Sequence, residues 1–237
     1  MNQFEVKAKD GTVFLQLPLL MGVRHAFGTR QEWKVLLTTF GLSHQQLLTL
    51  KQVHGADVLL WRGRENSEPL PRFPRCDAVI TDKEGIALGI WTADCIPILM
   101  ADTHRGVIAA VHAGWRGLCR GIVQRVISKM VKTFGSPAQD ILVGIGPGIG
   151  PCCYEVGNDV VDLFKTSHDG THLFIQERRK RSYLDLSLVS RLQLQQMGIP
   201  PENIEDIPLC TACREDLFFS YRRDGKTGRQ LNIIIMG

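Results

Sequence analysis

The chain has 237 residues, of which 44% are hydrophobic and 22% are charged, and its formal net charge is +4. This length excludes a peptide too small to bury a core, and the composition is that of a globular protein. The mildly basic charge is compatible with anionic ligands. It is too small to indicate nucleic-acid binding, so we expect no nucleic-acid partner.

The N-terminus has no apolar segment of the kind found in export signals. The longest apolar stretch, residues 85–101, is interrupted by Asp94 and Pro97, so we expect no membrane span. We therefore expect a cytoplasmic protein. Most of the seven cysteines should then be reduced thiols, some of which could bind metal, and their odd number argues against a full disulfide framework.

The first half of the chain is predicted to contain strands and loops. Charge and proline predict an exposed loop at residues 62–75. Apolar runs predict neighbouring strands at 77–81 and 86–91, joined by a turn, and another strand at 106–111. The apolar pattern continues through Trp-Thr-Ala-Asp-Cys-Ile-Pro at 91–97. This continuation places an aspartate and a cysteine in a core strand.

The second half adds helical periodicity. Apolar residues at i, i+4 spacing predict an amphipathic helix that opens at 114–117, continues to 131 and ends at Gly135. Polar residues at 166–181, including a basic run at 178–181, predict a solvated loop. Further strands are predicted at 141–143 and 233–235, and further helices at 160–164 and 187–197. The mixture predicts an α+β fold: a single layered domain over 1–237, with mixed β-sheets flanked by helices.

Asp94 requires a partner in this setting, because an unpaired buried charge costs several kcal/mol or more. His112, at the end of a predicted strand, and His54 are the candidates. Together with Cys95 they form a ligand set suited to zinc, and three ligands leave one coordination position open, as in catalytic sites. Spacing alone does not establish this trio, because no short motif links His54 to Cys95 and a histidine beside a strand is more often a core residue.

Two glycine-rich segments are candidate ligand sites. Arg116 lies where the predicted helix begins, a position suited to phosphate or carboxylate, but a surface arginine at a strand–helix turn is an equal alternative. The glycines at 144–150 do not match the spacing of a dinucleotide-binding loop, and Pro147 removes an N–H donor. We interpret this segment as a rigid turn.

Two further motifs gave weaker signals. Cys210 and Cys213 form a C-x-x-C pair, but Cys152 and Cys153 do not repeat it at zinc-ribbon spacing, so separate structural thiols are the favoured interpretation. The basic segment 221–229 is predicted to be hairpin-like, and either plain surface or a cover for an anionic substrate.

Six motifs occur in an order that resembles one known family. They are Lys-Gln-Val-His-Gly at 51–55, Asp-Ala-Val-Ile-Thr at 77–81, Thr-Ala-Asp-Cys-Ile-Pro at 92–97, His-Ala-Gly-Trp-Arg-Gly at 112–117, Gly-Pro-Gly-Ile-Gly-Pro-Cys-Cys-Tyr-Glu-Val-Gly at 146–157 and Ser-Tyr-Arg-Arg-Asp at 220–224. Together they resemble the YfiH family, also called laccase-domain or polyphenol oxidase proteins. The N-terminal part of the chain resembles the family less closely. Residues 28–30 resemble the family's Thr-Arg element, but residues 31–34 are Gln-Glu-Trp-Lys where the family usually has Gly-Gly-Val-Ser.

The resemblance implies a layered α+β fold and a metal site, usually zinc, at the matching residues His54, Cys95 and His112. It implies purine nucleoside phosphorylase activity on adenosine, inosine, guanosine and methylthioadenosine, with adenosine deaminase activity. The partners would be purine nucleosides and phosphate, and the chain a monomer or homodimer. The family's older label is copper-dependent phenol oxidation, so copper is the alternative metal. Some bacterial members are linked to peptidoglycan amino-acid editing.

Under this interpretation Asp94, Cys95 and His112 are the expected catalytic residues, and Arg116 and Arg30 the expected substrate- or phosphate-binding residues. Asp94 would handle a proton or orient the site. In a continuous strand Asp94 and Cys95 would point to opposite faces, whereas a turn caused by Pro97 could bring both inward. The alternatives are a copper-dependent polyphenol oxidase, a cysteine hydrolase using Cys95 and His112, and a non-catalytic zinc-stabilised binding domain.

Overall fold

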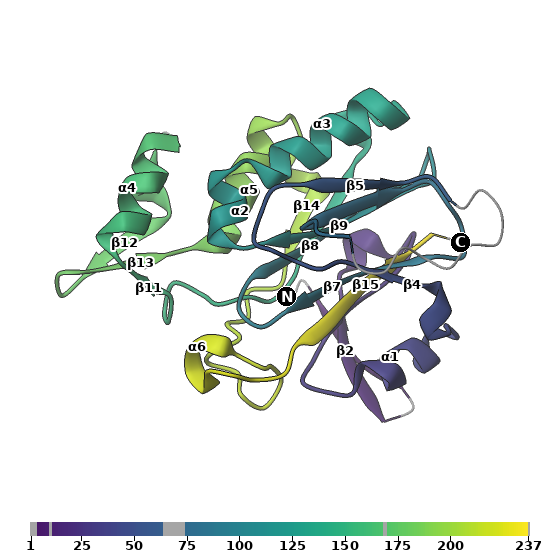
Figure 1. The fold of residues 1–237 in the computed structure, drawn as a ribbon, viewed down its shortest axis with the longest axis horizontal. Helices are drawn as coiled ribbons and strands as arrows, with labels where there is room; N and C mark the ends of the chain where they lie inside the picture. Colours follow the sequence, from purple (N-terminus) through teal and green to yellow (C-terminus); the bar gives the residue numbers. More distant parts are fainter. Residues whose placement is uncertain (1–3, 10, 64–73, 168–169, 237) are drawn as a thin grey trace.

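The computed structural model describes residues 4–9, 11–63, 74–167 and 170–236. These residues form two six-stranded sheets, a three-stranded sheet and six α-helices (Figure 1). Both large sheets contain parallel and antiparallel pairs. This arrangement confirms the predicted α+β fold class with mixed sheets. None of the helices formed by the described residues is long and apolar enough to cross a membrane.

The first sheet contains both the first and the last strand of the described chain. Its strand order is β1 (Glu5–Lys9), β2 (Thr12–Gln16), β3 (Arg24–Gly28), β15 (Gln230–Ile235), β7 (Ala87–Thr92) and β4 (Leu47–Thr49). The last strand, β15, lies between β3 and β7 and is antiparallel to both. Helix α1 (Trp33–Thr39) contributes Leu36 and Leu37 to a core against Ile233 and Ile235 of β15.

The second sheet contains the two longest strands, β8 and β9, at its centre. Its order is β14 (Ile204–Asp206), β10 (Leu142–Ile145), β8 (Ile96–Asp102), β9 (Val107–Ala113), β6 (Ala78–Thr81) and β5 (Val58–Trp61). Every residue of β8 and β9 is buried. Continuous apolar strands of this kind are expected where both faces of a sheet are covered.

Alternate side chains of these strands enter two different cores, because successive residues of a strand point to opposite faces. Leu99 and Ile108 pack with Phe27 and Leu88 of the first sheet. Met100 and Val111 pack on the other side, against helices α3 (Ile122–Phe134) and α5 (Leu186–Gln196). The single domain over residues 1–237 stays a prediction, and the core shared by the two large sheets supports it.

The small third sheet lies at one end of the molecule beside α4 (Asn158–Ser167) (Figure 1). It consists of β11 (Glu155–Val156), β13 (Arg181–Leu184) and β12 (Ile175–Arg178). The basic run 178–181 spans the exposed turn of the β12–β13 hairpin, as expected for a solvated segment. The prediction of one loop over 166–181 was wrong, because this segment also contains the end of α4 and the strand β12. Short 3-10 helices occur at Pro18–Leu20, His44–Gln46, Ala138–Asp140, Thr171–Leu173 and Pro201–Asn203.

Three other predictions about elements need correction. Strands β6 and β7 are not neighbours, because the turn after β6 carries the chain from the second sheet to the first. The predicted long helix is two helices, α2 (Trp115–Cys119) and α3, separated at Gly121, whose φ is 74°. The basic segment at 221–229 begins with a short helix, α6 (Tyr221–Asp224), rather than a hairpin strand. Most of the predicted loop at 62–75 lies outside the described residues.

Candidate metal centre

Cys95 lies on a turn that connects the two large sheets. Strand β7 ends at Thr92 and β8 begins at Ile96, so the expectation of a continuous core strand through Asp94 and Cys95 was wrong. The turn depends on Asp94, whose φ of 101° is rare for a residue other than glycine. Pro97 is not the cause, because it lies within β8 and pairs with His112 of β9.

The His112 ring is held in place by the buried carboxylate of Asp77. Only 3% of the residue is exposed, and its Nδ1 lies 2.8 Å from Oδ1 of Asp77, which precedes β6. A carboxylate accepts this hydrogen bond, so Nδ1 carries the proton and Nε2 is left for the site. The His112 backbone N–H also donates to the Asp77 carbonyl oxygen, at 2.7 Å.

The same carboxylate holds the loop that carries His54. Asp77 accepts hydrogen bonds from the backbone N–H groups of Val53, His54 and Gly55, at 2.7 to 3.2 Å. His54 has a positive φ of 58°, which the loop requires in order to present these consecutive donors to one side chain. Asp77 therefore positions both histidines, although they lie on separate elements.

The three predicted ligands converge. Ligand atoms of His54, Cys95 and His112 all lie within 4.8 Å of one another, and the two imidazole rings are 4.9 Å apart in an edge-to-face arrangement. Gly114 allows this approach, because a Cβ there would be 3.0 Å from the Cys95 sulfur and 3.3 Å from His54 Cδ2. Two imidazoles and one thiol are a donor set that suits zinc and leaves room for a fourth ligand.

The cluster also favours charge separation between its members. Burial alone would raise the pKa of Cys95, but the neighbouring His112 and His54 outweigh it and lower the pKa to about 6. Burial would likewise lower the pKa of His112, but Cys95 and Asp77 raise it to about 9. A thiolate beside imidazole groups is the protonation state in which a cysteine binds metal or attacks a carbonyl.

Asp94 contacts a different part of the chain. Its Oδ1 accepts a hydrogen bond from the Thr211 hydroxyl at 2.7 Å, and its Oδ2 accepts one from the Arg222 backbone N–H at 2.7 Å. Its carbonyl oxygen accepts a hydrogen bond from the Ile149 N–H at 2.8 Å. Asp94 thus anchors the turn that carries Cys95 to three other segments.

The two predicted anion-binding arginines lie on different elements. Arg116 is on α2, with its guanidinium 4.4 Å from the centre of the Trp115 ring. Arg30 donates a hydrogen bond to the Glu215 carbonyl oxygen at 2.6 Å, and its guanidinium lies 5.1 Å from the centre of the Phe219 ring. None of the hydrogen bonds or ring contacts found in the described part of the chain joins either arginine to His54, Cys95 or His112.

Sequence reasoning missed two residues of this site. Asp77 is visible in the sequence only as the first residue of a motif. An acidic residue directly before a buried strand is, however, a signal that could have identified it as a site residue. Tyr154 lies in the motif at 146–157. Burial and the negative charge of Cys95 raise the pKa of its hydroxyl, and the Arg222 guanidinium lies 5.0 Å from the centre of its ring. The Tyr154 hydroxyl is therefore protonated at neutral pH, and its titration is coupled to the charge of Cys95.

The fold and the site define a class of protein: a layered α+β protein with a His–Cys–His cluster where its two large sheets are joined. The chain belongs to the family described as multi-copper polyphenol oxidoreductase laccase, whose model matches residues 28–237. The crystal structure of Bacillus licheniformis hypothetical protein YfiH has the same fold, with a TM-score of 0.91, 25% identity and 100% of both chains covered. These findings confirm the family predicted from the motifs.

Curated relatives of this chain carry enzyme names. Purine nucleoside phosphorylase YlmD of Geobacillus stearothermophilus is 39% identical over 191 residues, which is 78% of this chain and 70% of that protein. Adenosine deaminase RL5, from an unknown prokaryotic organism, is 32% identical over 196 residues, which is 80% of this chain and 74% of that protein. Relatives of this kind indicate that the chain is an enzyme.

Proposed function

We propose that the protein is a zinc-dependent purine nucleoside phosphorylase with adenosine deaminase activity. The convergence of His54, Cys95 and His112 within 4.8 Å carries the proposal. The names of the relatives from Geobacillus stearothermophilus and the unknown prokaryote support the two activities. The proposed substrates are phosphate with adenosine, inosine, guanosine or methylthioadenosine.

Zinc would be held by one nitrogen of each histidine and by the Cys95 sulfur, and when bound it would supply a Lewis acid for the nucleoside or for water. The residues around it have separate tasks. Asp77 retains the proton on His112 Nδ1 and so keeps the other ring nitrogen free to bind. Asp94 holds the Cys95 turn in its left-handed conformation through Thr211 and Arg222. We therefore propose Asp94 as an orienting residue rather than a proton carrier.

In phosphorolysis the bond between ribose C1′ and the purine nitrogen breaks, a phosphate oxygen bonds to C1′, and the base leaves with a proton. The phosphate must be held against the sugar during this exchange. We assign this task to the Arg116 guanidinium and not to the helix dipole, because α2 has only five residues. We assign the Tyr154 hydroxyl, whose raised pKa keeps it protonated, as a hydrogen-bond donor to the substrate.

Arg30 is assigned to substrate binding through a neighbouring cleft. This shallow cleft is lined by Gln31, Trp33, Trp91, Phe219, Thr227, Gly228 and Arg229. The Arg30 guanidinium lies over Phe219, and the Trp33 and Trp91 rings are 5.8 Å apart. Aromatic faces beside a guanidinium suit a planar base. The loop at 31–34, which departs from the family pattern, contributes two of these residues.

The histidines and cysteines of the described residues support copper-dependent phenol oxidation less well than a zinc-dependent reaction. A multi-copper oxidase needs several coppers and many histidines, whereas the described residues contain one histidine-bearing cluster. His25, for example, is engaged elsewhere, because its Nε2 accepts a hydrogen bond from the Leu17 N–H at 3.0 Å. His168 lies outside the described residues. Copper could still occupy the same His–Cys–His site, since it exceeds zinc in intrinsic affinity for such donors.

A cysteine hydrolase is the second candidate, and one observation favours it. Asp77, His112 and Cys95 lie in the order of an orienting acid, a base and a nucleophile. This arrangement would attack an amide or ester, as in peptidoglycan amino-acid editing, without metal. It predicts that alkylation of Cys95 abolishes turnover, and that metal-free protein forms an acyl intermediate.

The test of the proposed function is an incubation of zinc-loaded protein with adenosine or inosine and phosphate, followed by assay of free base and ribose 1-phosphate. We expect both products in equal amounts, and loss of both in Cys95→Ala and His112→Ala. Cys119→Ala is the matched control, because this half-buried thiol belongs to neither cysteine cluster. Absence of ribose 1-phosphate from the zinc-loaded native protein would overturn the proposal.

A monomeric or dimeric state and a cytoplasmic location stay predictions.

A further inference from the structure

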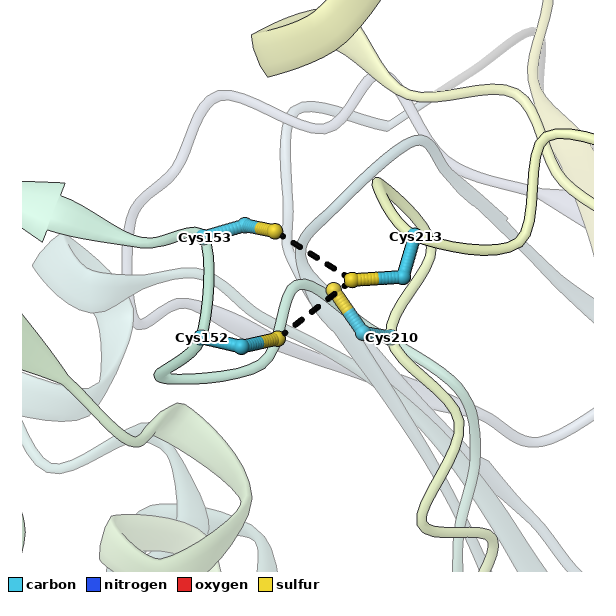
Figure 2. Close-up of side chains that lie close together, drawn as sticks. All are labelled: Cys152, Cys153, Cys210 and Cys213. Carbon is cyan, nitrogen blue, oxygen red and sulfur yellow. Dashed lines mark hydrogen bonds between the residues drawn. The ribbon is translucent and has the colours of Figure 1, made fainter.

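Four of the seven cysteines form a second cluster, separate from the proposed active site. Cys152 and Cys153 lie on the turn after β10, and Cys210 and Cys213 lie on the segment after β14. All four sulfur atoms lie within 4.8 Å of one another. Figure 2 shows the four side chains pointing toward a common centre. Their meeting corrects the interpretation of Cys210 and Cys213 as a pair without a counterpart.

The backbone fixes the two segments in register at this point. Gly148 and Cys210 form a parallel bridge, and the Thr211 N–H donates to the Gly148 carbonyl oxygen at 2.9 Å. The Gly150 N–H donates to the Cys210 sulfur at 3.2 Å. A Cβ at Gly150 would be 3.3 Å from the sulfur of Cys152, so glycine gives the thiols room to approach. The cluster is therefore built by the fold, and it does not depend on side-chain flexibility.

The spacing of the sulfurs matches a tetrahedral thiolate site. A zinc–sulfur bond of about 2.3 Å places tetrahedral sulfurs about 3.8 Å apart. The Cys213 sulfur is 3.6 Å from that of Cys152 and 3.4 Å from that of Cys153. A disulfide requires a sulfur–sulfur distance of about 2.05 Å and joins only two of the four residues. The arrangement thus suits one shared cation better than a pair of cystines.

Two guanidinium groups lie beside the cluster. That of Arg223 already pairs with Asp224 at 2.6 Å, so they offset only part of the negative charge that four thiolates and one divalent cation would carry. The Arg222 guanidinium donates to the carbonyl oxygen of Glu155, at 2.9 Å, beside the first cysteine pair. The Arg223 guanidinium donates to the carbonyl oxygens of Thr211 and Ala212, between the cysteines of the second pair. Cys152 and Cys213 are exposed, so a cation can reach the cluster from solvent.

We propose that Cys152, Cys153, Cys210 and Cys213 bind a structural zinc ion through four thiolates. Such a site is closed, with no position left for substrate, and it stabilises the fold around it. Both of its loops also reach the active site. Tyr154 directly follows Cys153, and Thr211, between Cys210 and Cys213, donates its hydroxyl to Asp94. The zinc therefore ties together two segments that position the substrate side of the His–Cys–His centre.

The test counts zinc by elemental analysis in protein purified under reducing conditions without added metal. We expect about two zinc ions per chain in the native protein, one for each centre. Cys213→Ser and the double variant Cys152→Ser/Cys213→Ser should each lose about one of the two zinc ions. Both cysteines are exposed, so we expect these variants to fold. Cys119→Ala is the matched control and should keep both. Cys95→Ala should lose the other zinc and keep the one at the four cysteines.

A second measurement reports on the ligand atoms themselves and not on the amount of zinc bound. Cobalt replacing zinc in Cys95→Ala should give the intense thiolate-to-cobalt absorption of a four-sulfur site, and Cys213→Ser added to this protein should weaken it. Equal zinc content in native protein and Cys213→Ser would overturn the proposal. A disulfide between Cys153 and Cys213 in the reduced preparation, found by mass spectrometry, would also overturn it. So would iron with acid-labile sulfide in place of zinc at these residues.

Discussion

Asp77 joins the two histidines of the proposed metal centre: its carboxylate accepts a hydrogen bond from Nδ1 of His112, at 2.8 Å, and another from the backbone N–H of His54, at 2.9 Å. No part of Asp77 is exposed to solvent. Burial raises the pKa of this carboxyl, but the hydrogen bonds from His112 and Gly55 outweigh burial and keep it below the usual range. One carboxylate thus sets the ring orientation of His112 and the loop conformation of His54, two of the three proposed ligands.

Removing this charge should weaken metal binding. Asp77→Asn keeps the shape of the side chain but loses its charge and one acceptor oxygen. We expect zinc affinity to fall roughly 10- to 100-fold, as is usual when the partner of a histidine ligand is lost. Competition with a chelator measures the affinity. Asp216→Asn, at an exposed position, is the control. Equal zinc affinity in folded Asp77→Asn and native protein would contradict the assigned role.

Gly114 should be required for the approach of Cys95 to His54. In Gly114→Ala the new methyl group would lie 3.0 Å from the Cys95 sulfur, so the ligands must move apart. We expect zinc affinity to fall at least roughly 10-fold, while the unfolding temperature of the metal-free protein changes little. Gly22→Ala is the matched control, because its methyl group would make only an ordinary contact, 3.5 Å from Thr103. Unchanged zinc binding in Gly114→Ala would show that the site is more open than the structure indicates.

Asp94 should act through position and not through proton transfer. Both of its oxygens accept hydrogen bonds, from the Thr211 hydroxyl and the Arg222 N–H. We therefore expect Asp94→Asn and Thr211→Val to lower kcat by similar factors, roughly 10-fold, without changing the shape of the pH–rate profile. Thr211→Val should also lower the free energy of unfolding by about 1–3 kcal/mol. If Asp94→Asn alone abolished one limb of the pH profile, Asp94 would be a proton carrier.

His25 should make stability depend on pH. Burial lowers its pKa in the folded protein, although hydrogen bonds to backbone carbonyls of Val23 and Leu20 oppose this. As pH falls below about 6.5 the unfolded chain takes up a proton that the folded chain excludes, so stability present above this pH is lost. The slope due to this residue is at most about 1.4 kcal/mol per pH unit.

Urea unfolding between pH 5 and 8 measures this dependence. In His25→Gln a neutral amide can take the hydrogen bond from the Leu17 N–H, so the variant should lose stability less steeply as pH falls. The comparison isolates His25 from the other histidines of the chain. Parallel pH curves for the two proteins would show that His25 contributes nothing to the dependence.

Local sequence patterns predicted the parts of the fold that depend on local periodicity. The buried strand β9 follows from an apolar run and the helix α3 from i, i+4 spacing, whereas the three predicted ligands came from motifs that resemble the family. The assignment of each strand to one of the two large sheets could not be predicted in this way. Nothing in the turn at 82–85 shows that it crosses from one sheet to the other, because sheet membership depends on partners that are distant in the sequence.

The rest of the site depends on long-range contacts or on backbone strain. The turn at Asp94 requires a positive φ at a residue that is not glycine, and a positive φ has no reliable sequence signal away from glycine. The four cysteines meet because Gly148 pairs with Cys210, a contact across 62 positions that no spacing rule predicts. Asp77 was visible in a motif, but its role appears only when His54 and His112 are folded onto it.

The metal centre is tested most directly by measuring zinc content and ribose 1-phosphate formation on the same preparation of His54→Asn. Asparagine tolerates the positive φ of 58° at this exposed position, so the loop and its hydrogen bonds to Asp77 should persist. We predict that this variant loses about one zinc ion per chain and loses phosphorolysis with it. Native rates of ribose 1-phosphate formation in a variant that has lost this zinc would contradict a metal-dependent reaction at His54, Cys95 and His112.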